Sequence, residues 1–193
     1  MTSTLHDDAR ERREALRGRL LAQRSEFMAG AHAAAAGVAL ARHLTSVLRE
    51  LEPESIGLYW PMRSEFNAVP ALAADPALAK LPIALPFAQR EPIRMHYRAW
   101  DGRTPTVKDE CGIAASDGAP LVPDVVLAPC VGYTTQGLRL GYGGGYFDRW
   151  LAQHAHVTAV GVAWALGEID ASSYEAQPHD LALTLIVTER GIV

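Results

Sequence analysis

Cysteine is scarce in this 193-residue chain, and what is absent around it is informative. Cys111 and Cys130 are the only cysteines, and they form no Cys-x-x-Cys pair. This number and spacing exclude a disulfide framework and the usual ligand spacing of a structural zinc site. We therefore expect a protein of the reducing cytoplasm.

The chain also lacks a basic excess and a long apolar run. Its formal net charge is -4, which excludes a whole-surface footprint for nucleic acid but permits a local anion site. The alanine-rich stretch 29–41 is interrupted by His32 and flanked by Arg42, and charges occur throughout the first twenty residues. We expect no signal peptide, no membrane span, and neither nucleic acid nor membrane as a partner.

The remaining composition is that of one globular domain. Hydrophobic residues make up 49% and charged residues 21% of the chain, and the length suits a single domain over 1–193. Leucines at helical spacing predict an amphipathic helix over 8–24, with Arg13 and Arg17 four residues apart on one face. A second helix is predicted over about 27–51, so the N-terminal helices occupy about 8–51.

Beyond Pro53, short apolar runs alternate with helical stretches over an α/β body of about 54–193. Helices are predicted at 68–79 and 145–155, and a long loop or hairpin at 101–120. The alternation predicts a three-layer, Rossmann-like α/β sandwich with a mixed, mostly parallel sheet flanked by helices. The predicted strands are 55–60, 81–87, 92–100, 124–131, 157–165 and 183–189.

The stretch "RLGYGGGYFDRWL", residues 139–151, carries four glycines just before a predicted helix. Each glycine costs roughly 0.5–1 kcal/mol relative to alanine in regular structure, so the loop needs either positive φ or a surface that a ligand approaches too closely for a Cβ. A glycine loop that enters a helix can hold phosphate on backbone N–H groups. However, the loop has neither the third glycine of a dinucleotide fingerprint nor the Lys-Ser/Thr of a P-loop.

Two interpretations of this loop remain open on spacing alone. One is a glycine-rich turn in which Asp148 interacts with the helix dipole, and the other is an anion site. Arg139 before the loop favours the anion site. Tyr142 and Tyr146 add planar rings that can stack on a heterocycle, as a nucleotide or a pterin would require.

These residues also carry a resemblance to a known family. The glycine loop resembles the signature of 5-formyltetrahydrofolate cyclo-ligases, also called methenyltetrahydrofolate synthetases. "RREALR" resembles the family's N-terminal Lys/Arg-x-x-Leu-Arg element, "IGLYWPMRSEFNA" its early strand and glutamate, and "PHDLALTLIVTERG" its C-terminal His-Asp segment. The order and spacing hold from about residue 10 to the end of the chain.

The resemblance implies a cyclo-ligase fold and an ATP-dependent ring closure. In that reaction 5-formyltetrahydrofolate and ATP give 5,10-methenyltetrahydrofolate, ADP and phosphate, with Mg²⁺ as cofactor. A formamide oxygen leaves poorly, so its phosphorylation allows N10 to attack the formyl carbon. Such chemistry needs positioning and charge neutralisation more than a nucleophilic side chain.

Residue roles follow from the same resemblance. Arg139, Tyr146 and Asp148 are implied as catalytic, and Asp148 and Asp180 as metal ligands. The implied folate site consists of Trp60, Glu65, Tyr142 and Tyr146. The implied ATP site consists of Arg13, Arg17, Arg139, Leu140, Gly141, Tyr142, Gly143, Gly144, Gly145, Tyr146 and Phe147.

Some positions depart from the family pattern, and two other functions compete with it. Gly144 stands where some members have lysine, and Phe147, Thr134 and Thr184 replace other family residues.

One alternative function is a non-catalytic folate- or nucleotide-binding protein, which the intact Arg13, Arg17, Asp148 and Asp180 oppose. The other, a Rossmann oxidoreductase, lacks its glycine fingerprint. We expect a monomer that acts on small molecules.

Overall fold

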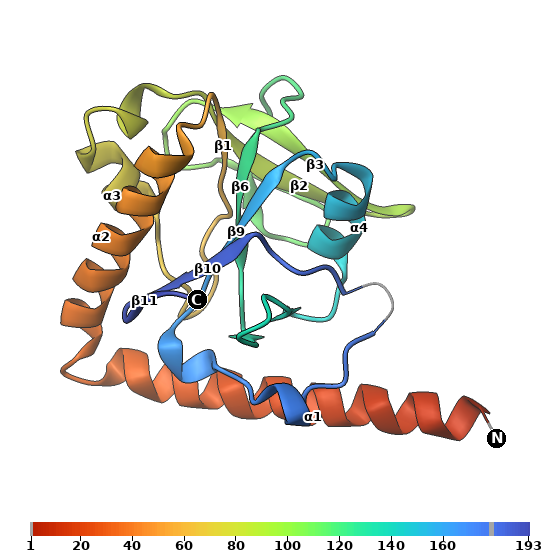
Figure 1. Ribbon diagram of the computed structural model, residues 1–193. Helices are drawn as coiled ribbons and strands as arrows, with labels where there is room; N and C mark the ends of the chain where they lie inside the picture. Colours follow the sequence, from red (N-terminus) through yellow and green to blue (C-terminus); the bar gives the residue numbers. More distant parts are fainter. Residues whose placement is uncertain (1, 178–179) are drawn as a thin grey trace.

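A seven-stranded sheet forms the centre of the computed structural model, which describes residues 2–177 and 180–193. The strand order is β11-β10-β9-β6-β1-β2-β3 (Figure 1). The five inner strands are parallel, and β3 and β11 pair antiparallel at the two edges. The strands are β1 (Ile56–Gly57), β2 (Ile83–Arg90), β3 (Ile93–Trp100), β6 (Val125–Pro129), β9 (Thr158–Val162), β10 (Leu185–Thr188) and β11 (Gly191–Ile192). The predicted mixed, mostly parallel sheet is confirmed.

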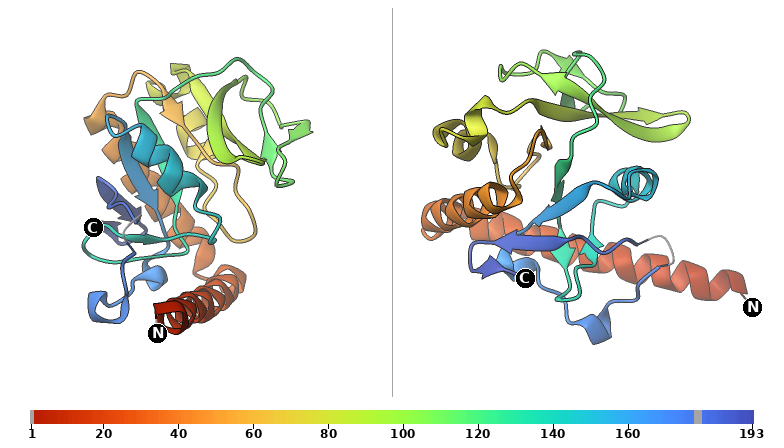
Figure 2. Two further views of the ribbon diagram at one scale, coloured as in Figure 1. Left: turned by 90° about the vertical axis from the view of Figure 1, so that its right-hand side faces the viewer. Right: turned by 45° about the horizontal axis from the view of Figure 1, so that its top comes forward.

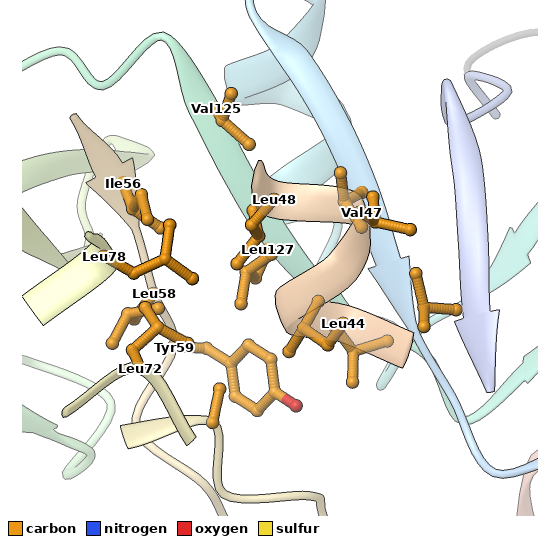
Figure 3. Packing of buried hydrophobic residues seen from close by; sticks show 14 of the residues in the cluster. Leu44, Val47, Leu48, Ile56, Leu58, Tyr59, Leu72, Leu78, Val125 and Leu127 are labelled. Carbon is orange, nitrogen blue, oxygen red and sulfur yellow. The ribbon is translucent and has the colours of Figure 1, made fainter. Parts of the chain in front are cut away.

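Helices cover both faces of this sheet. Successive residues of β6 point to opposite faces: Leu127 packs with α2 (Ala33–Leu51), whereas Val126 packs with α4 (Tyr146–Gln153). Leu44, Val47 and Leu48 of α2 form the larger core together with β1, β6 and the short α3 (Val69–Ala74) (Figure 3). Strands buried on both faces explain the continuous apolar runs in the sequence. The three-layer α/β fold is confirmed.

The first helix, α1 (Thr2–Ala29), lies outside these layers. It crosses the carboxyl ends of the inner strands, next to the segments that follow β6 and β9 (Figures 1 and 2). Its Leu20 packs against Leu140, Val131 and Ile169 in a separate apolar cluster. Leu140 belongs to the short hairpin of β7 (Gly132–Tyr133) and β8 (Arg139–Leu140). In open α/β sheets, this end of the strands is where ligands bind.

Several predicted boundaries were wrong. The first helix runs to Ala29 rather than 24, and the second begins at Ala33 rather than 27, because the chain breaks at Gly30. The predicted helix 68–79 splits into α3 and the 3-10 turn η1 (Leu78–Lys80). Pro76 explains the split, since a residue before proline avoids the helical region and Asp75 has ψ of 117°.

The remaining elements are short. The 101–120 segment contains a small hairpin of β4 (Val107–Lys108) and β5 (Ala114–Ala115), as expected. Two 3-10 turns, η2 (Ala165–Gly167) and η3 (Ala171–Ser173), lie between β9 and β10. Over residues 2–177 and 180–193, none of the helices is both long and apolar enough to cross a membrane.

Candidate active site

A cavity of about 650 Å³ lies at the carboxyl end of the sheet. Its wall comes from α1, the segment after β1, the β2–β3 hairpin, the β4–β5 hairpin, the end of β6, the glycine loop with the start of α4, and the segment that precedes β10. Arginines and glycines line one part, and Trp60, Met95 and Ile113 line another. The cavity therefore combines cationic and apolar surfaces.

The glycine loop has its composition for two physical reasons. Gly143 and Gly145 have φ of 92° and 65°, a region that L side chains rarely adopt. At Gly141 the reason is close approach, because a Cβ there would lie 2.5 Å from Nη1 of Arg139. The predicted positive φ is thus present, and the groups that approach Gly141 and Gly143 in the structure are the protein's own arginines, whereas close approach by a ligand stays a prediction.

Arg139 and Asp148 form a buried ion pair beside this loop. Nη2 of Arg139 donates to Oδ1 of Asp148 at 2.9 Å, and the guanidinium lies 5.3 Å from the centre of the Phe147 ring. Asp148 sits in the first turn of α4, where a carboxylate also interacts favourably with the helix dipole. Arg139 is thereby held with its charge at the cavity wall.

Arg13 and Asp180 form a second ion pair at the same cavity. Nη1 and Nη2 of Arg13 donate to the two Asp180 oxygens at 2.6 and 3.1 Å. Nη2 also donates to the Tyr174 hydroxyl at 2.9 Å, and this hydroxyl donates to the Arg139 carbonyl at 3.0 Å. Burial alone would lower the pKa of Arg13, but Asp180 and Tyr174 raise it above its usual value. Tyr174 therefore links the two ion pairs.

Arg17 reaches the glycine loop directly. Its Nε donates to the Gly141 carbonyl at 2.7 Å, and its guanidinium would lie 3.3 Å from a Cβ at Gly143. Burial, followed by the nearby charge of Arg13, lowers the pKa of Arg17. Two adjacent guanidinium groups at one wall repel each other, and a polyanion between them would relieve that repulsion.

Trp60 and Glu65 also line the cavity. The Trp60 ring meets Trp100 edge-on at 6.0 Å, which fixes its plane. Oε2 of Glu65 accepts a hydrogen bond from the Met62 N–H at 2.7 Å. Burial raises the pKa of Glu65, although the Met62 N–H, Tyr142 and the charges of Arg24 and Arg63 oppose this rise. A buried carboxylate beside a fixed aromatic ring can accept hydrogen bonds from a planar heterocycle.

Tyr146 begins α4 and lines the same cavity. Its hydroxyl lies 3.1 Å from Sγ of Cys111, which belongs to the β4–β5 hairpin. This contact and burial raise the pKa of Tyr146 to about 12. Tyr146 is therefore a neutral hydroxyl at pH 7, able to donate a hydrogen bond but not to serve as a base.

All but one of the residues given a role from the sequence line this cavity. They are Arg13, Arg17, Trp60, Glu65, Arg139, Gly141, Tyr142, Gly143, Gly144, Gly145, Tyr146, Phe147, Asp148 and Asp180. Leu140 differs, because its side chain is fully buried against Leu20. The prediction for Leu140 thus concerns its backbone alone.

Sequence reasoning missed two polar residues that hold the cavity wall in place. Tyr174 lies in a segment whose sequence has no regular pattern, so nothing indicated its contacts with Arg13 and Arg139. Arg24 is 2% exposed and bonds to Tyr142. Its spacing held a signal, since positions 13, 17 and 24 fall on one face of a helix.

Comparison with known proteins assigns the chain to a family. The sequence model of the 5-formyltetrahydrofolate cyclo-ligase family matches residues 9–189. The chain belongs to that family. A 5-formyltetrahydrofolate cyclo-ligase of Mycolicibacterium smegmatis is 41% identical over 71 residues, which is 36% of each chain. Another, from Mycoplasma pneumoniae, is 36% identical over 67 residues, 34% of this chain and 39% of that protein. The matched segments thus span little more than a third of these relatives.

Solved structures agree on the fold over nearly the whole chain. A 5,10-methenyltetrahydrofolate synthetase from Mycoplasma pneumoniae superposes with a TM-score of 0.70 at 21% identity, covering 92% of this chain and 98% of the other. One from Aquifex aeolicus gives a TM-score of 0.73 at 21% identity, covering 93% and 91%. The cyclo-ligase fold expected from the resemblance is confirmed.

Proposed function

We propose that the protein converts 5-formyltetrahydrofolate and ATP to 5,10-methenyltetrahydrofolate, ADP and phosphate. Family membership supports this activity. The single observation that carries it is the cavity, in which Arg13, Arg17 and Arg139 share a wall with the glycine loop while Trp60 and Glu65 line another part. A polyanion and a planar heterocycle can bind there side by side, as phosphoryl transfer between them requires.

The chemistry proceeds in two steps. The formyl oxygen attacks the γ-phosphorus of ATP, so an O–P bond forms while the bond to ADP breaks. N10 then attacks the formyl carbon and loses its proton, and the C–O bond breaks with phosphate as the leaving group. The arginines and the loop N–H groups neutralise charge on the transferred phosphoryl group. Glu65 accepts hydrogen bonds from the pterin, and the Tyr146 hydroxyl donates one at the reacting end.

Mg²⁺ belongs to this proposal, with Asp148 and Asp180 as its ligands. Over the described residues, no group of three or more His, Cys, Asp and Glu side chains could hold a metal by itself. Two carboxylates nevertheless suit Mg²⁺, which is commonly bound by one or two carboxylates together with substrate phosphates and water. Both carboxylates line the cavity, each paired with an arginine. When bound, the ion would neutralise phosphate charge.

The decisive experiment follows methenyltetrahydrofolate absorbance with purified protein. We expect product only when both ATP and Mg²⁺ are present. Product formed equally well without ATP contradicts the cyclo-ligase reaction. Binding of 5-formyltetrahydrofolate without turnover would instead identify a non-catalytic binding protein.

We further propose that the chain acts as a monomer in the cytoplasm on these small molecules, without a nucleic acid or membrane partner. The small number of cysteines, both free in the structure, supports a reducing compartment. The net charge of -4 supports the absence of a general nucleic-acid surface. The residues that line the cavity all come from one chain, which supports a site that needs no second copy.

A further inference from the structure

Arg24 is a buried cation that has no role in the proposed reaction. It lies on α1, is 2% exposed, and does not line the large cavity. Its Nε donates to Oγ of Ser64 at 3.0 Å, and its Nη2 donates to the Tyr142 hydroxyl. Both partners are uncharged hydroxyl groups. Among the described residues, Arg24 forms no ion pair. Burying a guanidinium with neutral partners is unfavourable, so the site must gain something from its charge.

The two hydrogen bonds of Arg24 join three segments of the cavity wall. Ser64 lies between Met62 and Glu65 in the sequence, and the side chains of Met62 and Glu65 line the cavity. Tyr142 belongs to the glycine loop and also lines it. The helix that carries Arg24 supplies Arg13 and Arg17 to the same wall. Arg24 thus fixes the Glu65 segment and the glycine loop to one rigid helix.

Arg24 also places a positive charge toward Glu65. The groups that face Glu65 come from every neighbouring segment: Arg24 from α1, Arg63 from its own segment, Tyr59 after β1, Tyr142 from the glycine loop and Cys130 after β6. Two of these are cations, and Arg63 is exposed to solvent. Solvent screens exposed charges strongly, so Arg24 has the greater influence.

We propose that Arg24 is a positioning residue for folate binding, which holds the Glu65 segment against Tyr142 and supplies the buried positive charge that Glu65 faces. The assignment rests on the proposed function for the identity of the ligand. Burial raises the pKa of Glu65 and Arg24 opposes the rise. Removal of Arg24 therefore raises this pKa further, and Glu65 loses its ionised, accepting form at a higher pH than in the wild type.

The test is calorimetric binding of 5-formyltetrahydrofolate without ATP, at several pH values, to wild-type protein, Arg24→Gln and Arg24→Lys. Arg24→Gln removes the charge, and Arg24→Lys keeps the charge but loses the two-nitrogen geometry. Arg19→Gln, an exposed change on the same helix, is the matched control. ATP affinity is measured in parallel.

We expect Arg24→Gln to weaken folate binding roughly 10-fold at pH 7, as loss of a buried charged hydrogen-bond donor does, with ATP affinity within about twofold of wild type. The acidic limb of folate binding moves to higher pH in Arg24→Gln and stays in place in Arg24→Lys and Arg19→Gln. An equal loss in both Arg24 variants with no movement of the acidic limb overturns the proposal, since a purely structural role acts in that way.

Two further outcomes are separable. If Arg24→Gln does not fold, Ser64→Ala replaces it, because this variant removes only the acceptor of Nε. Folate affinity then falls a few-fold with ATP affinity unchanged, and unchanged folate affinity overturns the proposal. Wild-type protein that binds folate but forms no product contradicts the proposed reaction and leaves this binding test valid.

Discussion

Arg13 on the first helix and Asp180 near the end of the chain form a two-bond ion pair across 167 positions of sequence. The side chain of Asp180 is only 5% exposed, and that of Arg13 is 17% exposed. The pair therefore fastens α1 to the segment that precedes β10. Removal of one partner costs more folding stability here than at a surface ion pair, because the remaining charge is then buried without a counter-charge.

Asp180→Asn should lower the free energy of unfolding by roughly 1–3 kcal/mol, since Arg13 loses its counter-charge. Urea denaturation measures the effect. Glu175→Gln is the control, because Glu175 pairs with Arg12 at 2.8 Å but both side chains are more than half exposed. The control should change stability by at most about 0.5 kcal/mol. Equal effects of the two variants would show that burial of the Arg13 pair is energetically unimportant.

Tyr174→Phe should weaken ATP binding about 5- to 10-fold with little effect on folate, because the variant loses the hydroxyl between Arg13 and the Arg139 carbonyl. Burial raises the pKa of Tyr174 to about 12, so the hydroxyl is a donor at pH 7. Separate KM values for ATP and folate provide the measurement. Tyr97→Phe is the matched control, since the buried Tyr97 hydroxyl has no hydrogen-bond partner within the described residues. Comparable KM values in both variants would remove the positioning role of Tyr174.

Arg17→Ala should reduce ATP affinity about tenfold, because the guanidinium that contacts the glycine loop is lost. A partly exposed cation contributes little to folding, so stability should fall by no more than about 1 kcal/mol. Equilibrium ATP binding and thermal melting measure the two effects, with Arg19→Ala as the control on the same helix. A variant that melts early but binds ATP normally would assign Arg17 a structural role.

Asp148→Asn should keep the fold, lower turnover at least ~10-fold and raise the Mg²⁺ concentration needed for half-maximal rate. The amide can still accept a hydrogen bond from Arg139 but has no charge for the metal. Asp180→Asn should act in the same direction but more weakly. The measurement is rate against Mg²⁺ at saturating ATP, and unchanged Mg²⁺ dependence in both variants removes the metal role from this pair.

Gly143→Ala should destabilise the protein by about 1–2 kcal/mol, because φ of 92° is unfavourable for any L side chain. The new methyl group would also lie 3.3 Å from the Arg17 guanidinium, so ATP affinity should fall as well. Gly18→Ala is the opposite case: it is exposed on α1 with no atom within 4 Å of the new Cβ. That change should stabilise the protein by up to about 1 kcal/mol. Thermal and urea unfolding compare the two, and a neutral Gly143→Ala would show that the loop relaxes freely.

The sheet and its layers could be predicted because their signal is local. Runs such as 125–131 are apolar at successive positions, which happens where both faces of a strand are covered, as α2 and α4 cover β6. Helix ends were predicted less well, since the break at Gly30 has no capping pattern around it and the leucines that indicated the first helix end at Leu21, whereas the helix continues through Phe27 and Met28. Pro76, by contrast, did mark the end of the helix that the apolar pattern overran.

The candidate site could be predicted where glycine, arginine and aromatic residues cluster in sequence. The cluster at 139–148 identified one wall, and Arg13 and Arg17 were found through helical spacing. The partners of these arginines could not be predicted, because Asp180 and Tyr174 meet Arg13 only after the chain has folded. Arg24 was missed although its spacing places it on the helix face of Arg13 and Arg17, because the sequence pattern of a helix does not show whether an arginine is buried or solvated.

The unbroken length of α1 determines which substitutions, insertions and deletions this helix can tolerate. Arg13 and Arg24 are separated by eleven residues, which a helix spaces at about 16 Å with both side chains on nearly the same face. Backbone hydrogen bonds therefore fix how far apart the ends of the cavity lie at which we propose that the nucleotide and the folate bind. Substitutions on the solvent side of α1 leave that distance unchanged. A single-residue insertion or deletion between positions 13 and 24 rotates one end of the helix by about 100° relative to the other, so Arg13 and Arg24 no longer lie on one face.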